Sequence, residues 1–204
     1  MTRSARIERK TAETDILAEL LVDGSGRSDI QTGIPFFDHM LTLLTKHSLC
    51  DLTLHCKGDL EIDFHHTVED CGIALGQAFT KALGDKKGIN RYGWAVVPMD
   101  EARVAVALDF SGRPVLVYEA DLLIQVGGAV IGRTAEDRFT PQLVEEFLRA
   151  FVTNAAMNLH VSVQAGRDAH HIIEGTFKAL AKALDLACQV NPRVQGIPST
   201  KGVL

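Results

Sequence analysis

The sequence predicts an α+β protein made of two similar half-domains that pack as a pseudo-symmetric pair. The pentapeptide HHTVE (65–69) returns as HHIIE (170–174) 105 positions later, and the pattern of helical and alternating stretches around it also repeats. A period of this length is far longer than a solenoid repeat, so it indicates a duplicated half-domain. We place the first half at residues 1–90, with HHTVE, and the second at residues 91–204, with HHIIE and a C-terminal STKG segment.

In the first half, the alternating segment TDILAELLVD (14–23) predicts a strand near the N-terminus. A helix is expected next, from apolar residues at helical spacing, namely Phe37, Met40, Leu41 and Leu44. The stretch DLTLHCKG (51–58) alternates and predicts a second strand. The stretch HHTVEDCGIALGQAFTKAL (65–83) predicts a second helix, which Gly84 ends.

The second half follows the same plan. Strands are expected at VAVALDF and VLVYEA, which flank the turn SGRP (111–114). A helix is predicted from Val144, Phe147, Leu148 and Phe151. A strand follows at NLHVSVQAG (158–166), and a long helix at 170–187 ends before Asn191-Pro192. A shift of 105 places Leu54-His55 on Leu159-His160 and Asp63 on Asp168, while upstream a shift of 107 sets His39 opposite Glu146.

Composition narrows the functional class. The chain has 204 residues, of which 46% are hydrophobic and 23% are charged, as in an ordinary globular protein. A net charge of -5 argues against an extended nucleic-acid surface. The sequence has neither a signal-peptide pattern nor an apolar run of membrane-spanning length, and its four cysteines form no CxxC pair. We therefore expect a cytoplasmic protein with free thiols.

The two HHxxE motifs indicate metal binding. Successive helical residues project about 100° apart, so adjacent histidines face different directions, whereas each glutamate shares a face with a histidine. One motif thus offers ligands in two directions, and two motifs brought together by pseudo-symmetry could hold two metal ions between them. A single His-His pair at a helix start is more often a surface or capping pair. Two copies in register, each with its glutamate, favour a metal site.

Other residues near the motifs extend the candidate ligand set. His39 forms a polar pair with Asp38 on an otherwise apolar helix, and an aspartate is a common partner that orients a metal-bound imidazole. Glu146, opposite His39 in the repeat, can also bind metal. Because no cysteine clusters with the motifs, the donors are nitrogen and oxygen, which suits Mn, Fe, Co, Ni or Zn at a catalytic position. The residues alone do not choose the metal.

Several basic residues next to glycine or proline suggest a local anion site. Arg91 lies in GINRYG, Arg113 in SGRP, and Ser199 and Lys201 in IPSTKG. Arginine binds phosphate as a bidentate fork and lysine as a point charge, although a solvated loop arginine is the ordinary case. Lys178 follows His170 by about 12 Å on the same predicted helix. A phosphate held there would place the other end of a small molecule at the metals.

Four stretches carry a family resemblance: TGIPFFDHML, DFHHTVEDCGIALGQA, AHHIIEGTFKALAKAL and IPSTKGVL. Together they resemble imidazoleglycerol-phosphate dehydratase, a lyase of histidine biosynthesis, over nearly the whole chain. The resemblance implies half-domains that each have a four-stranded mixed sheet with helices on one face. It also implies a homo-oligomer of 24 subunits with active sites at subunit interfaces and two Mn²⁺ ions per site.

The resemblance also implies roles for individual residues. The implied metal ligands are His39, His65, His66, Glu69, His170, His171 and Glu174, and the repeat adds Glu146 as a further candidate. The implied substrate ligands are Glu13, Arg91, Arg113, Lys178, Ser199 and Lys201, and the implied catalytic residues are Glu13, Glu69 and Glu174, with Glu13 as the proton-transfer group. Two departures stand out: several members have histidine where this chain has Glu146, and the segment 121–136 is longer than in compact members.

The implied reaction is the metal-dependent dehydration of D-erythro-imidazoleglycerol 3-phosphate to imidazoleacetol phosphate and water, by way of a metal-bound imidazolate. Two other classes explain the histidines. A dinuclear metallohydrolase would release inorganic phosphate, and a metal-stapled scaffold would assemble with metal but would not bind phosphorylated imidazoles. A redox enzyme is disfavoured, because the sequence has neither a GxGxxG fingerprint after a strand nor a cysteine pair.

Overall fold

A computed structural model describes residues 2–126, 131–132 and 138–204. The first half contains β1 (Ser4–Lys10), β2 (Thr14–Leu21), β3 (Ser28–Gln31), α1 (Pro35–Ser48), β4 (Asp51–Gly58) and α2 (His65–Leu83). The second contains β5 (Tyr92–Met99), β6 (Ala102–Asp109), β7 (Val115–Glu119), α3 (Asp121–Gln125), α4 (Pro141–Ala155), β8 (Asn158–Ala165) and α5 (Ala169–Cys188). The two halves therefore share one element order, apart from the short helix α3.

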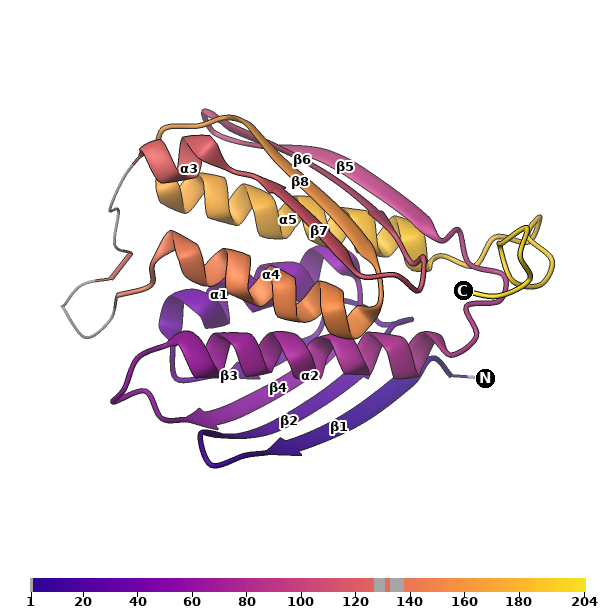
Figure 1. Cartoon of the computed structure of the whole chain (residues 1–204), viewed down its shortest axis with the longest axis horizontal. Helices are drawn as coiled ribbons and strands as arrows, with labels where there is room; N and C mark the ends of the chain where they lie inside the picture. Colours follow the sequence, from indigo (N-terminus) through magenta and orange to yellow (C-terminus); the bar gives the residue numbers. More distant parts are fainter. Residues whose placement is uncertain (1, 127–130, 133–137) are drawn as a thin grey trace.

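Each half has one four-stranded mixed sheet, with order β1-β2-β4-β3 in the first and β5-β6-β8-β7 in the second. In the first half, β2 pairs antiparallel with both β1 and β4, and β3 pairs with β4 in parallel. In the second half, β6 pairs antiparallel with both β5 and β8, and β7 pairs with β8 in parallel. The long helices α1, α2, α4 and α5 lie between the two sheets, one sheet on each side (Figure 1). The predicted pair of half-domains, each with helices on one face of its sheet, is confirmed.

The two halves exchange helix partners. Helix α1 of the first half packs against α5 of the second, and α4 of the second packs against α2 of the first. Gly72 and Gly76 permit the second contact, because an added Cβ at either would lie 2.7 Å from a carbonyl oxygen of α4. Each long helix that starts with an HHxxE motif therefore meets a helix from the other half.

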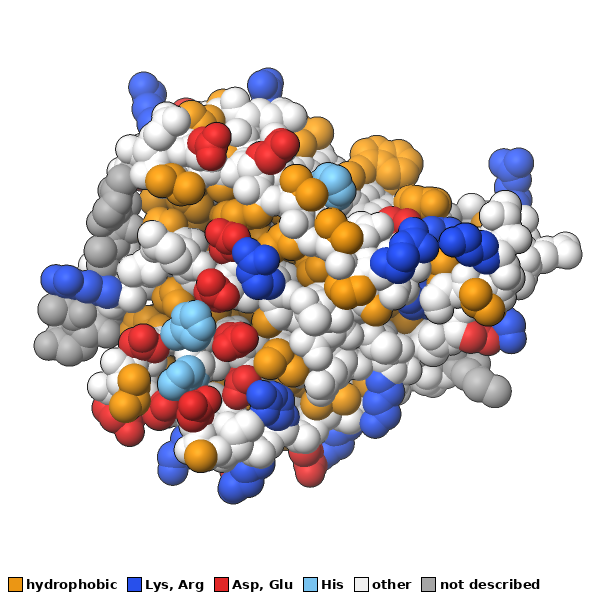
Figure 2. Space-filling model, viewed as in Figure 1, with side chains coloured by type: hydrophobic (Ala, Val, Ile, Leu, Met, Phe, Trp, Pro, Cys, Tyr) orange, Lys and Arg blue, Asp and Glu red, His pale blue; other side chains and the backbone are white. Residues whose placement is uncertain are grey.

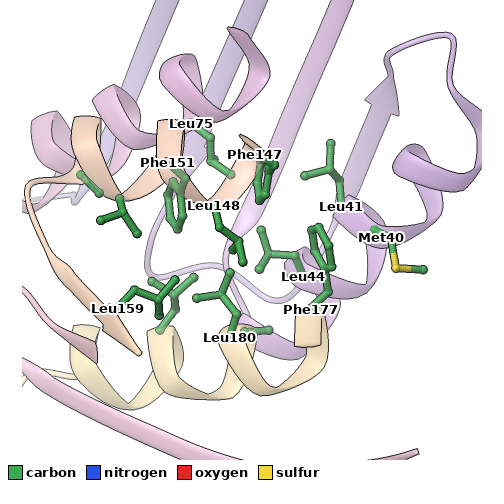
Figure 3. Packing of buried hydrophobic residues seen from close by; sticks show 14 of the residues in the cluster. Met40, Leu41, Leu44, Leu75, Phe147, Leu148, Phe151, Leu159, Phe177 and Leu180 are labelled. Carbon is green, nitrogen blue, oxygen red and sulfur yellow. The ribbon is translucent and has the colours of Figure 1, made fainter. Parts of the chain in front are cut away.

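Leucine and phenylalanine side chains fill the centre between the helices (Figure 3). The ring of Phe147 stacks on Phe151 at 5.9 Å and on Phe177 at 5.5 Å, and it meets Phe37 edge-on at 5.4 Å. All four residues are fully buried and come from α1, α4 and α5. The core is therefore shared between the halves, which fixes the starts of the long helices relative to one another.

The elements predicted from the repeat are confirmed to within a residue or two, and Gly84 ends α2 with a positive φ of 54°. Strands β1, β3 and β5 were not predicted. Strand β1 alternates over only a few residues before the charged run Glu8-Arg9-Lys10, β3 has only four residues, and β5 contains Gly93 and Pro98, so the strand signal is weak in each.

One alignment within the repeat was wrong. The α1 and α4 helices end in left-handed caps at Leu49 and Ala156, and Asp51 and Asn158 take matching places in their sheets, so a shift of 107 holds through these strands. Leu54-His55 is therefore not equivalent to Leu159-His160. The change to a shift of 105 falls in the loop after the strand, where the second half is two residues shorter.

Candidate metal and substrate site

The histidine pairs stand at the first turns of the two long helices, as predicted. Asp63 accepts a hydrogen bond from the His65 amide at 2.7 Å. Asp168 accepts from the amides of His170 and His171 at 2.8 and 3.3 Å. These caps satisfy amides that have no partner within the helix and fix the backbone from which the imidazoles project.

One cluster of possible metal ligands forms where α1 crosses α5. The His39 Nε2 atom lies 3.6 Å from Glu174 Oε2, and the His170 Nε2 atom lies 3.2 Å from the same oxygen. Among residues 2–126, 131–132 and 138–204, these are the three side chains whose donor atoms all lie within 4.8 Å of one another. His39 comes from the first half and the other two from the second, so the exchange of helix partners creates the cluster.

Lys178 lies one turn beyond Glu174 and binds it, with 2.6 Å between Nζ and Oε1. The Glu174 side chain is only 9% exposed. Burial is the largest single influence and opposes ionisation, but Lys178, His170 and His39 together outweigh it and leave the pKa of Glu174 below its ordinary value. The carboxylate is therefore charged at neutral pH, as a metal ligand must be.

The corresponding place in the other half is more open. His65 Nε2 lies 3.7 Å from Glu69 Oε2, and both side chains are nearly half exposed. Glu146 is on α4, which packs against α2, but within the described part of the chain it does not join these two in a cluster of three. Ile73 stands where the repeat places Lys178, so this half lacks the lysine as well.

The second histidine of each motif faces a different carboxylate. His66 Nδ1 lies 3.0 Å from Asp59 Oδ2, and His171 Nδ1 lies 2.8 Å from Glu101 Oε2. These contacts raise the pKa of both histidines, and the His171 contact together with the Arg167 amide lowers the pKa of Glu101 to about 2. Asp59 and Glu101 were both missed in the sequence. The hairpin repeat could have revealed Glu101, because it stands 88 residues after Glu13, as β6 does after β2.

The remaining carboxylates occupy different positions. Glu13 lies in the β1–β2 turn, with its Oε1 atom 3.8 Å from His66 Nε2 and its side chain 51% exposed. Asp38 does not orient His39, and that interpretation was wrong. Its carboxylate accepts instead from the Thr32 amide at 2.9 Å and from the Thr32 hydroxyl at 2.6 Å, which fixes the loop before α1.

Most of the predicted phosphate ligands gather at the far end of α5. The Arg91 amide donates to Ala187 in the last turn of that helix, and its guanidinium binds both Asp109 and the Pro198 carbonyl. The C-terminal residue Leu204 returns against Gly112, next to Arg113. Ser199 and Lys201 belong to the same C-terminal segment, where the Lys201 amide donates to Ser199 Oγ at 3.2 Å.

This basic group is far from the histidines of the same chain. His170 lies in the first turn of α5 and Ala187 in its last turn, which separates the two groups by about 26 Å at about 1.5 Å per residue. Figure 2 shows histidine side chains among acidic ones on one part of the surface, and a separate group of lysine and arginine side chains on the side of the molecule where the C-terminus lies. Among the predicted phosphate ligands, Lys178 lies beside the cluster of possible metal ligands, through its ion pair with Glu174.

A cavity of about 700 Å³ adjoins His39 and His170, and Ile131 and Gly132 also line it. These two residues belong to the longer segment 121–136, most of whose centre lies outside the described residues. Phe139, which pairs with Ile131, packs against Phe36 with ring centroids 5.1 Å apart. The segment therefore reaches the candidate metal site from the second half.

Comparison with known proteins identifies the family. The family model described as imidazoleglycerol-phosphate dehydratase matches residues 32–184, three quarters of the chain. The chain belongs to the imidazoleglycerol-phosphate dehydratase family. It is 55% identical to the imidazoleglycerol-phosphate dehydratase of Caldanaerobacter subterraneus over 202 residues, which cover 99% of this chain and 100% of that one. It is also 55% identical to the enzyme of that name from Moorella thermoacetica, with full coverage of both.

Solved structures agree with this membership in the imidazoleglycerol-phosphate dehydratase family. The Staphylococcus aureus dehydratase matches with a TM-score of 0.77 and 36% identity, over 92% of this chain and 99% of that one. The IGPD of Pyrococcus furiosus, solved in complex with (S)-C348, matches with a TM-score of 0.78 and 32% identity, over 97% of this chain and all of that one. In the described residues of this family member, no helix is long and apolar enough to cross a membrane.

Proposed function

We propose that the protein dehydrates D-erythro-imidazoleglycerol 3-phosphate to imidazoleacetol phosphate and water, a step of L-histidine biosynthesis. Its relatives of full-length similarity bear the name of this hydro-lyase. The observation that carries the proposal is the convergence of His39, His170 and Glu174 from the two halves, within a chain of this family. Neither rival class, hydrolase or metal-stapled scaffold, has any support among the relatives named above.

We propose further that the enzyme binds two Mn²⁺ ions per active site. The donor set fits, because it combines imidazole nitrogens with carboxylate oxygens and lacks thiolate. Nearby carboxylates accept from the far ring nitrogens of His66 and His171, as is usual for metal-binding histidines. The proposed ligands are His39, His65, His66, Glu69, Glu146, His170, His171 and Glu174. When bound, the ions would stabilise the imidazolate form of the substrate ring.

Side chains of the protein would carry out proton transfer and bind the phosphate of the substrate. The anionic ring of the substrate expels the hydroxyl of the adjacent side-chain carbon, which leaves as water once it is protonated. The neighbouring carbon then loses its proton, and the enol that results becomes the ketone. Glu13 is suited to move these protons because its carboxylate is half exposed and close to His66. The phosphate would be held by Arg91, Arg113, Lys178, Ser199 and Lys201.

A complete site then requires more than one copy of the chain. A small phosphorylated imidazole cannot span about 26 Å between the histidines and Arg91 of one chain. Subunit contacts are also favoured by the outer face of the second sheet, which is rich in apolar residues, including the exposed Trp94 and Val96. We therefore propose a homo-oligomer, of 24 subunits by family resemblance, with active sites at its interfaces. Four free thiols support a cytoplasmic location.

The decisive experiment removes metal with a chelator, restores Mn²⁺ and follows formation of the enolisable ketone from imidazoleglycerol phosphate. Turnover that appears only with metal is expected, and release of inorganic phosphate would instead indicate a hydrolase. A matched control is His47→Gln, on the last turn of α1, which should keep the activity that His39→Gln loses. Metal-dependent assembly without any turnover would favour the scaffold.

A further inference from the structure

His66 and His171 are oriented by carboxylates from different parts of the fold. Glu101, in the β5–β6 hairpin, binds His171, whereas Asp59, just after β4, binds His66. In each case the contact is with Nδ1. Glu101 and Asp59 therefore do not occupy equivalent positions in the repeat, although each carboxylate contacts the Nδ1 atom of the second histidine of its motif.

The two carboxylates differ in how their second oxygen is used. Glu101 Oε1 accepts from the amides of Arg167 and Asp168 at 3.1 and 2.9 Å, just before α5. Asp59 Oδ1 is buried, and within the described residues no donor bonds to it. Glu101 is thus held on both oxygens, and Asp59 on one.

A carboxylate can only accept hydrogen bonds, so the Nδ1 atom that faces it carries the proton in the neutral imidazole. The Nε2 atom then keeps its lone pair for a metal. The opposite tautomer would place a proton on Nε2 and block binding.

We propose that Glu101 and Asp59 are positioning residues that hold His171 and His66 in the tautomer whose Nε2 atom is free to bind metal. This inference rests on the metal binding proposed above. Under this proposal Glu101 has a different role from Glu13, its counterpart in the first hairpin. Because Asp59 makes the orienting contact with His66, Glu13 is not needed for that contact.

Amide substitutions separate this role from simple loss of charge. In Glu101→Gln, the amide oxygen is needed by the two backbone amides, so the NH₂ group faces His171 Nδ1 and imposes the wrong tautomer. In Asp59→Asn, the amide oxygen can face His66 while the NH₂ group takes the place of Oδ1, where no donor opposes it. Both changes remove one negative charge and keep the size of the side chain.

The test measures Mn²⁺ affinity of the intact protein by competition with a fluorescent chelator. We expect Glu101→Gln to weaken affinity about 10- to 100-fold and Asp59→Asn to weaken it well under tenfold. Asp59→Ala, which has no acceptor, should behave like Glu101→Gln. The control Glu8→Gln, on the exposed side of β1, should match the wild type.

The outcomes are distinct. Equal losses for Glu101→Gln and Asp59→Asn would show an effect of charge alone and overturn the proposal. The proposal would also be overturned if the metal-free Glu101→Gln protein unfolded at a lower temperature while its metal affinity was unchanged, since that result indicates a purely structural role. If Glu101→Gln does not fold, the Mn²⁺ affinities of Asp59→Asn and Asp59→Ala are compared instead. Equal affinities of these two variants would refute the proposal. A wild type that binds no metal would refute the proposed metal site itself, whereas one that binds metal without dehydrating the substrate would refute only the function.

Discussion

Replacing Asp70 should loosen the hairpin that carries Glu13. Asp70 directly follows Glu69 on α2 and is only 5% exposed. Its two oxygens accept from Arg9, at 2.8 Å, and from the hydroxyl of Thr14. Because these two residues flank Glu13, one buried carboxylate ties both arms of the hairpin to the helix that presents Glu69.

The structure also predicts which side of this ion pair is more costly to remove. Arg9→Met leaves a nearly buried carboxylate with only Thr14, which costs about 3–5 kcal/mol of unfolding free energy. Asp70→Asn leaves a guanidinium that is 26% exposed and that water can reach, so we expect about 1.5–3 kcal/mol. In the double variant the two losses should overlap by about 1.5–3 kcal/mol.

Urea unfolding at a fixed protein concentration, followed by circular dichroism, measures these differences for the two single variants and the double variant. Turnover should fall in Asp70→Asn although metal affinity stays near that of the wild type, because only the hairpin is released. Additive losses, or a smaller loss for Arg9→Met than for Asp70→Asn, would refute the reasoning from burial.

Other predictions follow from single contacts. Phe147→Ala should lower the unfolding free energy by about 3–5 kcal/mol in denaturant titrations, since its fully buried ring joins both halves. Lys178→Met should raise KM for the phosphorylated substrate at least tenfold while Mn²⁺ affinity, set by Glu174, changes less. Hydrogen bonds from Arg27 hold the pKa of Asp51 well below its usual range. Its contribution to stability is therefore present above about pH 4 and is lost as the pH falls toward the folded pKa, so Asp51→Asn should destabilise at pH 7 but differ less from the wild type in acid.

The sequence predicted the parts of the fold that periodicity controls. Apolar spacing located α2 and α5, since their buried faces repeat every three to four residues and Gly84 or Asn191-Pro192 ends them. It could not reveal that α1 packs on α5 and α4 on α2. That exchange depends on contacts between segments far apart in the chain, such as the close approach that Gly72 permits.

In the candidate site, too, local spacing predicted some residues, whereas those that depend on contacts between distant segments were missed. The HHxxE motifs were visible because both histidines and the glutamate lie within one helical turn, and spacing alone fixes their faces. Asp59 and Glu101 were invisible to that reasoning, because they reach the histidines from a loop and a hairpin tip. The interpretation of Asp38 as the partner of His39 was wrong, because adjacency in sequence does not determine where the carboxylate points.

The two hairpin glutamates show what duplication makes possible. Glu101 is bound by His171 and by two backbone amides, so its carboxylate is held in the ionised form and in one position. An orienting group needs both properties. A proton-transfer group needs the opposite, because it must gain and lose a proton while it follows the substrate. Glu13 occupies the equivalent hairpin position without such contacts to its side chain in the described residues, with Oε1 3.8 Å from His66 Nε2. Asp59 takes over the orienting contact in that half, so the same inherited position can orient a ligand in one half and remain free for proton transfer in the other.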